Sequence, residues 1–271
     1  IIAMDDYPGI LSSNMLLDRI FGAYVFLHKP DGTPLMDVVE QVAEKFESQG
    51  ERCYFIPMGG SNEIGALGYY ECAQELKQEF KSGHVIVPLG SMGTYMGLFC
   101  GLHDSDLTLT GVQIMPYEED IYKYACNYFD KIKKSWKLDF DVTEEDFDIA
   151  TDYLYGGYNV PSETVRNAIY DMARSEAIVL DPCYTGKTYA AFLDMLAEEK
   201  IQKDETIIFI HTGGLPGVYT PSHQKAFEAE LMDGVTILGL EDSSLVSEDA
   251  GRIVSDNQTS VSYTHLTLPT I

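Results

Sequence analysis

The sequence predicts an α/β fold in which helices cover both faces of a parallel sheet. Short apolar runs alternate along the chain with amphipathic stretches at helical spacing, and this order is typical of βαβ units. The apolar runs are hydrophobic at successive positions, as expected for strands that are buried on both faces. The chain has 271 residues, 45% of them hydrophobic, so it is long enough to bury a substantial core.

The expected elements follow this pattern from the first residue. Ile1 and Ile2 begin an apolar run that resembles the middle of a strand, and apolar residues from Val38 to Phe46 recur at helical spacing before Gly50. The next elements expected are a short strand at 53–57, a helix ending near 80, a strand at 84–88, a helix beginning near 94, a strand at 109–115 and a helix at 118–135. Beyond an acidic, aromatic stretch with a capping box at 143–146 come a helix from about 162, a strand at 177–180, a helix beginning near 187 and a strand at 206–211.

Four polar or glycine-rich turns mark the expected location of a functional site. They begin at Met58, Gly90, Asp181 and Thr212, and each follows an expected strand. Open parallel sheets bind their ligands outside the carboxyl ends of the strands. We therefore expect the site where these turns come together.

The turn Gly90-Ser91-Met92-Gly93-Thr94 has the composition of a phosphate-binding loop. Small residues let backbone N–H groups approach an anion, and hydroxyl groups add donors at the positive end of the following helix. The turn lacks the G-x-G of a dinucleotide-binding fingerprint, which disfavours a nucleotide-dependent dehydrogenase. From these residues alone, a tight turn without a ligand remains an equal alternative.

Three other features have weaker interpretations. Gly186-Lys187-Thr188 imitates the end of a P-loop, but Asp181 occupies the position of the first glycine, so Lys187 is expected at a helix start or on the surface. His211 has no second ligand at metal spacing, so a structural role is favoured and no metal site is predicted. Tyr158, beside two glycines, is either a packing residue or an acid/base group.

Charge and cysteine content limit the possible partners and compartment. The chain has 18 basic and 43 acidic residues, a formal net charge of −25, which disfavours binding to nucleic acid or to an anionic membrane surface. No apolar stretch approaches the ~18 residues of a membrane span. Five cysteines without a C-x-x-C pair, and a start without basic residues, predict free thiols in a reducing cytoplasm.

Five motifs occur in a fixed order along the chain: Ile56-Pro57-Met58-Gly59-Gly60-Ser61-Asn62, Gly65-Ala66-Leu67-Gly68-Tyr69, Gly90-Ser91-Met92-Gly93-Thr94, Leu180-Asp181-Pro182-Cys183-Tyr184-Thr185-Gly186-Lys187 and Phe209-Ile210-His211-Thr212-Gly213-Gly214. Together they resemble the D-cysteine desulfhydrase and 1-aminocyclopropane-1-carboxylate (ACC) deaminase family. Members of this family are pyridoxal 5'-phosphate (PLP) enzymes with the tryptophan-synthase-β-like fold type II. The resemblance extends to about Leu231.

The resemblance implies two domains and an incomplete chain. Residues 1–50 would be the remainder of a small domain, residues 51–238 the large PLP-binding domain, and residues 239–271 an extension that is poorly packed from about Asn257 because its end resembles adaptor read-through. The Schiff-base lysine of the family, in a G-N-K segment, would lie upstream of Ile1. This fragment is therefore predicted to be inactive by itself.

The resemblance also assigns roles to individual residues. Gly90, Ser91, Met92, Gly93 and Thr94 would bind the phosphate of PLP. A tyrosine that matches Tyr184 stacks near the cofactor and moves protons, and one that matches Tyr158 lies in the substrate pocket. Thr185 would contact the cofactor, and Thr212 and Gly213 the substrate. Homodimers are common in the family.

Thr185 and Thr212 favour one activity within the family. ACC deaminases carry glutamate and leucine at these positions, whereas desulfhydrases carry hydroxyl residues. A hydroxyl near the pyridine nitrogen gives a weaker electron sink than a carboxylate, which suits the elimination of a good leaving group. The prediction is a β-eliminating lyase that converts D-cysteine to pyruvate, ammonia and hydrogen sulfide. ACC deaminase, cysteate sulfo-lyase and a non-catalytic small-molecule-binding module remain alternatives.

Overall fold

The computed structural model describes residues 1–4, 9–28, 31–202 and 204–235. Residues Ile1–Glu230 form one compact unit, and of the chain from Leu231 onward, which is separate from it, only residues 231–235 are described. The predictions for residues 239–271 lie outside the described residues. The predicted domain boundary near residue 50 stays a prediction.

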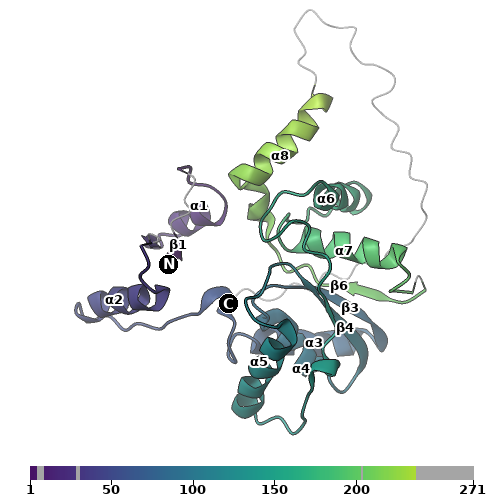
Figure 1. The fold of residues 1–271 in the computed structure, drawn as a ribbon, viewed down its shortest axis with the longest axis horizontal. Coiled ribbons are helices and arrows are strands. Elements are labelled where there is room, and N and C mark those ends of the chain that lie inside the picture. Colours follow the sequence, from purple (N-terminus) through teal and green to yellow (C-terminus); the bar gives the residue numbers. More distant parts are fainter. Residues whose placement is uncertain (5–8, 29–30, 203, 236–271) are drawn as a thin grey trace, which may run out of the picture. The chain divides into compact units, whose positions relative to one another are not determined.

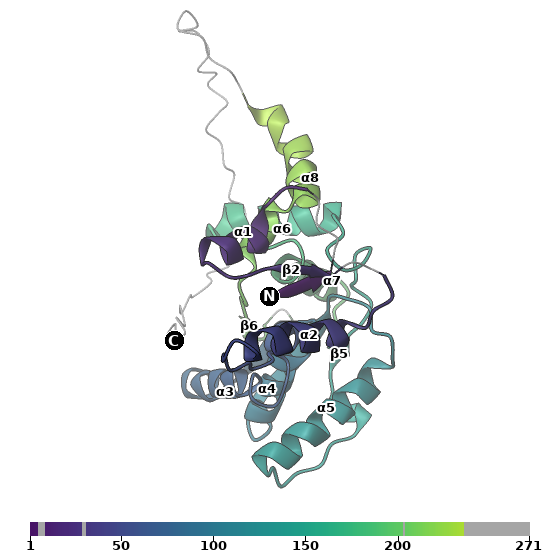
Figure 2. The same ribbon diagram turned by 90° about the vertical axis from the view of Figure 1, so that its left-hand side faces the viewer.

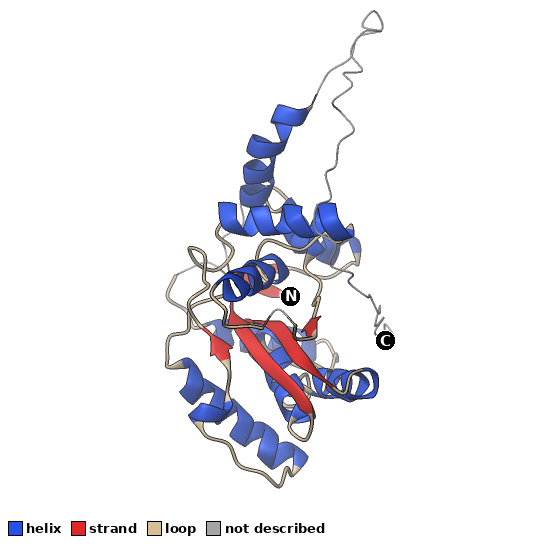
Figure 3. Ribbon diagram, turned by 90° about the vertical axis from the view of Figure 1, so that its right-hand side faces the viewer, coloured by secondary structure: helices blue, strands red, loops and turns tan. Residues whose placement is uncertain are grey.

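A four-stranded parallel sheet forms the centre of the first unit (Figure 3). Its order is β5 (Ile149–Ala150), β4 (Asp106–Gln113), β3 (Ser82–Leu89) and β6 (Ile207–Phe209). Strands β3 and β4 pair over their whole length, from Ser82 opposite Asp106 to Leu89 opposite Gln113. The predicted α/β class with a parallel sheet is confirmed.

Helices cover both faces of this sheet (Figure 1). Helices α3 (Leu67–Glu79), α4 (Gly93–Leu102) and α5 (Ile121–Trp136) lie on one face, and α6 (Glu163–Glu176) and α7 (Thr185–Ala197) lie on the other. Side chains along a strand alternate between the two faces. In β3, Val85 and Val87 accordingly pack in the cluster of α3, α4 and α5, whereas Ile86 packs with residues of α7.

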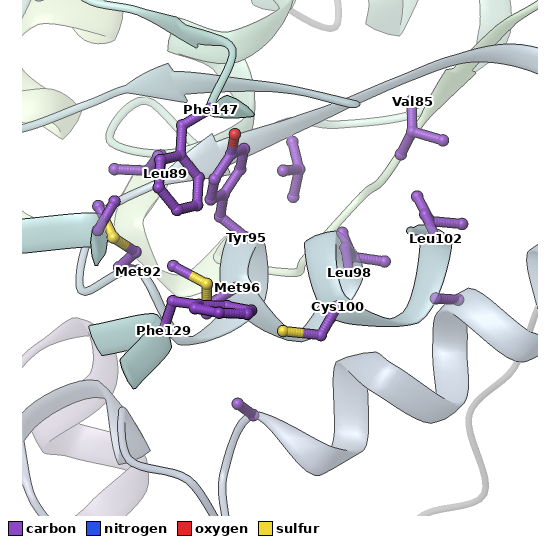
Figure 4. Close-up of a cluster of buried hydrophobic side chains, with 14 of the residues drawn as sticks. Val85, Leu89, Met92, Tyr95, Met96, Leu98, Cys100, Leu102, Phe129 and Phe147 are labelled. Carbon is purple, nitrogen blue, oxygen red and sulfur yellow. The ribbon is translucent and has the colours of Figure 1, made fainter. Parts of the chain in front are cut away.

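Helix α4 is buried on most of its surface and organises the larger hydrophobic cluster (Figure 4). Tyr95 lies beside Phe147 in this cluster, while Met96 lies near Phe129 of α5. The hydroxyl of Tyr95 donates a hydrogen bond to the carbonyl oxygen of Asp148, at 3.2 Å. This bond satisfies the polar end of a completely buried ring.

The first fifty residues contain a separate pair of strands. Strand β1 (Ile2–Met4) pairs in parallel with β2 (Phe26–His28), as Figure 2 shows. Helix α2 (Leu35–Glu47) confirms the helix that the apolar spacing predicts. Helix α1 (Ser13–Ile20) was not predicted from the sequence.

Two predicted strands are wrong. Residues 53–57 form no strand, and Tyr54 and Ile56 are 70% and 69% exposed, because no described strand lies beside them to supply hydrogen bonds. Residues 177–180 also form no strand. Ala177 ends α6 in the left-handed conformation, and only three residues then precede Asp181, so little chain remains for pairing.

The remaining described elements are short or lie near the end of the described chain. They are the 3₁₀ turns η1 (Met58–Gly60), η2 (Glu144–Asp146), η3 (Leu215–Tyr219) and η4 (Met232–Gly234), and helix α8 (Pro221–Leu231). The capping box predicted at 143–146 is present in η2. Of the helices in the described ranges, none has the length and apolar character needed to cross a bilayer.

Gly97 permits the close contact of α3 with α4, and its replacement should destabilise the protein. A Cβ at Gly97 would lie 2.3 Å from the carbonyl oxygen of Ala66, which neither backbone can avoid. We expect Gly97→Ala to lower the free energy of unfolding by about 2 kcal/mol. Gly68→Ala in α3 is the matched control, because its Cβ would meet nothing within 4 Å and alanine favours helix. Urea unfolding measures both, and equal effects would contradict this account.

Candidate functional site

The predicted turns come together at the carboxyl edge of the sheet. The hydroxyl of Ser61 lies 2.6 Å from that of Ser91, which joins the first turn to the second. A Cβ added to Gly90 would lie 3.7 Å from Tyr184 Cε1, and one added to Gly214 would lie 2.6 Å from Asp181 Oδ1. All four turns are therefore linked in one chain of close contacts.

The turn from Gly90 to Thr94 has the chemistry of an anion site. It ends at the N-terminus of α4, where Met92 adopts a left-handed conformation with φ of 70°, and the first turn of the helix carries no acidic residue. Ser91 and Thr94 are partly exposed. The positive end of the helix and these hydroxyls suit a phosphate monoester. The residues present therefore fit the phosphate of PLP.

Ser61 lies outside the 90–94 turn but supports it, and the sequence did not predict this role. Its hydroxyl accepts a hydrogen bond from the N–H of Gly93 at 3.2 Å, and a Cβ at Gly93 would lie 2.6 Å from Ser61 Oγ. The Tyr117 hydroxyl likewise donates to the carbonyl oxygen of Gly90. The Gly-Gly-Ser-Asn turn was a signal, but no local rule joins residue 61 to residue 93.

Asp181 fixes the start of helix α7. Its buried carboxylate accepts hydrogen bonds from the N–H groups of Cys183, Tyr184 and Thr185 and from the Thr185 hydroxyl, at 2.7–2.8 Å. An anion at this position also interacts favourably with the helix dipole. The sequence placed Asp181 at the start of one of the expected turns and against a P-loop, but it gave no role to the carboxylate. The carboxylate holds Tyr184 and Thr185 in place.

Thr185 has no exposed surface in this structure. Its hydroxyl donates to Asp181 Oδ1 and accepts from the N–H of Asp181, at 2.8 Å and 3.0 Å. The predicted contact of Thr185 with the cofactor stays a prediction. Whatever Thr185 contacts, its orientation depends on Asp181.

Tyr158 and Tyr184 form a pair of hydrogen-bonded phenols. Their hydroxyl oxygens are 2.5 Å apart, and the ring centroids are 6.0 Å apart in an edge-to-face arrangement. Burial raises the pKa of both above the ordinary 10.0, and for Tyr158 the hydrogen bond that it shares with Tyr184 adds to the increase. Both phenols are therefore neutral near pH 7. A neutral pair can hold one proton between them and donate another.

Lys187 is completely buried, so its predicted surface position is wrong, although it does lie at a helix start. Its ammonium donates to the carbonyl oxygens of Ile114 and Leu154, at 3.3 Å and 3.0 Å, and also to that of Gly157. The three carbonyls compensate for the loss of water around the charge. Sequence reasoning had no signal for this environment.

The segment after β6 approaches the site through Gly214. Gly213 has φ of +97°, and its N–H donates to His211 Nδ1 at 3.1 Å. Thr212 is partly exposed, and His211 is exposed. Among the described residues, no hydrogen bond joins Thr212 or Gly213 to the tyrosine pair, and the substrate role of both residues stays a prediction.

Comparisons with known proteins identify the class to which this fold and site belong. The threonine deaminase isoform 2 of Solanum lycopersicum aligns with a TM-score of 0.51 at 15% identity, over 87% of this chain and 66% of that one, which shows a shared fold. The sequence profile described as "Pyridoxal-phosphate dependent enzyme" matches residues 5–213. The chain belongs to this family, with fold type II and PLP as the family's cofactor.

Proteins with higher sequence identity to this chain show which members of the family it resembles. A protein of Pyrococcus abyssi (strain GE5 / Orsay) named "Putative 1-aminocyclopropane-1-carboxylate deaminase" is 32% identical over 218 residues, which is 78% of this chain and 64% of the relative. The crystal structure of an ACC deaminase homologue aligns with a TM-score of 0.72 at 28% identity, over 86% of this chain and 69% of that one. The chain thus spans less than two thirds of the curated relative's length.

Removal of the Asp181 charge should destabilise the protein strongly. Asp181→Asn leaves at least one buried N–H group without its acceptor and brings an amide N–H group into the same space. We expect a loss of about 2–4 kcal/mol in the free energy of unfolding. Asp120→Asn is the control, because exposed Asp120 caps α5 through the N–H groups of Tyr122 and Lys123 and asparagine caps equally well. A control as unstable as Asp181→Asn would refute the argument.

The tyrosine pair should lose stability in alkali. Because the folded pKa values lie above the unfolded ones, their contribution is complete below the unfolded pKa of about 10 and is lost as the pH rises beyond it. Tyr184→Phe should lower the pKa of Tyr158, since it removes a hydrogen bond and a neighbouring charge that oppose ionisation. NMR titration of isotope-labelled tyrosine measures this shift. An unchanged Tyr158 pKa would show that burial alone raises it.

Proposed function

We propose that the whole protein is a PLP-dependent β-eliminating lyase with D-cysteine as its lead substrate. The balanced reaction takes D-cysteine and water to pyruvate, ammonia and hydrogen sulfide. The observation that supports this choice is the pair Thr185 and Thr212, where ACC deaminases carry glutamate and leucine. The tyrosine pair beside a phosphate-binding turn supports proton transfer at the same site.

Each part of the site has a role in this proposal. The turn Gly90–Thr94 binds the cofactor's phosphate through backbone N–H groups and hydroxyls. When bound, PLP supplies the electron sink that stabilises charge at the substrate's Cα. Tyr184 and Tyr158 hold a proton near the departing sulfur, which leaves as hydrosulfide and needs that proton to form hydrogen sulfide.

Thr185 sets how strongly the cofactor withdraws electrons. A carboxylate beside the pyridine nitrogen holds a proton there more strongly than a hydroxyl does. Asp181 keeps its charge directed at the start of α7, with hydrogen bonds to N–H groups and to the Thr185 hydroxyl. When PLP is bound, this hydroxyl, which already donates to the Asp181 carboxylate, would be the group that Thr185 offers to the pyridine nitrogen in place of a carboxylate. A moderate electron sink suffices because hydrosulfide is a good leaving group.

ACC deaminase is the second candidate. The Pyrococcus abyssi relative and the ACC deaminase homologue carry this activity in their names, which do not distinguish it from D-cysteine desulfhydration. It would release 2-oxobutanoate and ammonia from ACC. Opening a cyclopropane ring demands stronger stabilisation of the carbanion, and a threonine at position 185 supports such stabilisation less well than a glutamate.

A cytoplasmic location and a homodimeric state remain predictions.

The two candidates differ in their products. The whole protein, loaded with PLP, is incubated separately with D-cysteine, L-cysteine, D-cysteate and ACC, and pyruvate, sulfide, sulfite and 2-oxobutanoate are measured. We expect pyruvate and sulfide from D-cysteine in equal amounts. Release of 2-oxobutanoate from ACC without turnover of D-cysteine would favour the deaminase, and sulfite from D-cysteate would favour a sulfo-lyase. The chain Ile1–Ile271 assayed alone tests its predicted inactivity.

A further inference from the structure

Lys187 connects the two elements that carry the tyrosine pair. It lies three residues after Tyr184, about one helical turn along α7, so the two side chains occupy neighbouring positions on that helix. Two of its three carbonyl partners, Leu154 and Gly157, belong to the loop that leads to Tyr158. The third, Ile114, follows strand β4. One side chain thus joins a helix, a loop and a strand end.

The chemistry of the contact requires the charged form of Lys187. An ammonium has three protons, whereas a neutral amine has two, and three carbonyl oxygens surround Nζ. Among the described residues, no carboxylate lies within 4.0 Å of this nitrogen. Burial lowers the pKa of Lys187, and nearby Cys183 and Asp181 offset only a part of that decrease. The carbonyls act as the coordination shell of an internal cation.

The loop that Lys187 contacts has an unusual backbone. Tyr155, Gly156, Gly157 and Asn159 all have positive φ angles, between 46° and 121°. Glycine and asparagine tolerate this conformation, but a tyrosine rarely adopts it unless the surroundings impose it. Three sets of hydrogen bonds hold the loop in this conformation. They are those of Lys187, that of Tyr155 with Asp194 at 2.7 Å, and that of Asn159 with His223 at 3.0 Å. Of these three sets, only that of Lys187 has an ammonium as its donor, and it lies at the centre of the loop.

We propose that Lys187 is a positioning residue whose buried ammonium, bound by the carbonyls of Ile114, Leu154 and Gly157, holds the 154–158 loop so that Tyr158 meets Tyr184. This inference rests on the proposed function for the catalytic use of the tyrosine pair. The contact itself exists independently of any substrate. The space left by Lys187→Ala would then be a carbonyl-lined site for a free ammonium ion.

The test compares Lys187→Met and Lys187→Ala with a matched control in the whole protein. Lys200→Met removes a lysine that also bonds a tyrosine, Tyr153, but is about half exposed and lies outside the site. Hydrogen exchange of residues 154–160 is measured by mass spectrometry. We expect about tenfold faster exchange there in Lys187→Met and no change in Lys200→Met. Unchanged exchange in Lys187→Met would overturn the proposal.

Ammonium rescue separates a cation-binding role from simple packing. We expect ammonium chloride to slow loop exchange in Lys187→Ala and to raise its melting temperature more than sodium chloride at equal ionic strength. Equal effects of the two salts would overturn the proposal. Kinetics on a substrate identified for the whole protein should show kcat reduced about tenfold or more in Lys187→Met, with little change in Lys200→Met.

A measurement on the unmodified protein tests the contact even if the Lys187 variants fail to fold. The ammonium group of Lys187 should give a slowly exchanging nitrogen signal with couplings across hydrogen bonds to the carbonyl carbons of Leu154 and Gly157. Absence of these couplings from the spectrum of the folded, unmodified protein would refute the contact. Failure of D-cysteine turnover would refute the proposed substrate but leave the exchange, rescue and coupling results intact, so the two failures are distinguishable.

Discussion

The hydrogen bonds of the Asp181 carboxylate to the start of helix α7 hold the site together. They fix the backbone of Tyr184 and Thr185, and the Asp181 side chain closes against Gly214 from the segment after β6. A buried anion is tolerable here because four donors and a helix N-terminus surround it. The tyrosine pair, the Thr185 hydroxyl and the last of the four turns all depend on this one group.

The start of α7 therefore contains two buried charges with separate partners. Asp181 is bound by N–H groups and a hydroxyl, whereas Lys187 is bound by carbonyls. Neither charge needs the other as its hydrogen-bond partner, and each organises a different segment. Asp181 orders the helix and the turn at Gly214, and Lys187 orders the loop before Tyr158. The contact between Tyr158 and Tyr184 lies where these two ordered regions meet.

The sequence predicted strands β3, β4 and β6 and most helices, but not the edge strand β5, because hydrophobic spacing is a local property that only the longer elements display clearly. Strand β3 and helices α3 and α5 lie within a few residues of their predicted bounds. The strand at 53–57 was wrong because apolar character alone does not supply a pairing partner. The burial of Lys187 and the role of Ser61 escaped prediction because their partners lie 73 and 30 residues away in sequence. The pattern of turns after expected strands predicted which segments meet, but not which of their atoms touch.

The distance in sequence between contacting residues also determines whether the site could be moved to another protein as one short segment. Ser61 contributes from one end and Gly214 from the other, and the contacts that join the four turns to one another connect segments far apart in the sequence. A P-loop occupies one short stretch of chain, which can in principle be moved between scaffolds as a unit. Here no single loop contains the site. The site therefore has no modular form, and exchange of function by loop grafting would have to transfer almost the whole central sheet with it.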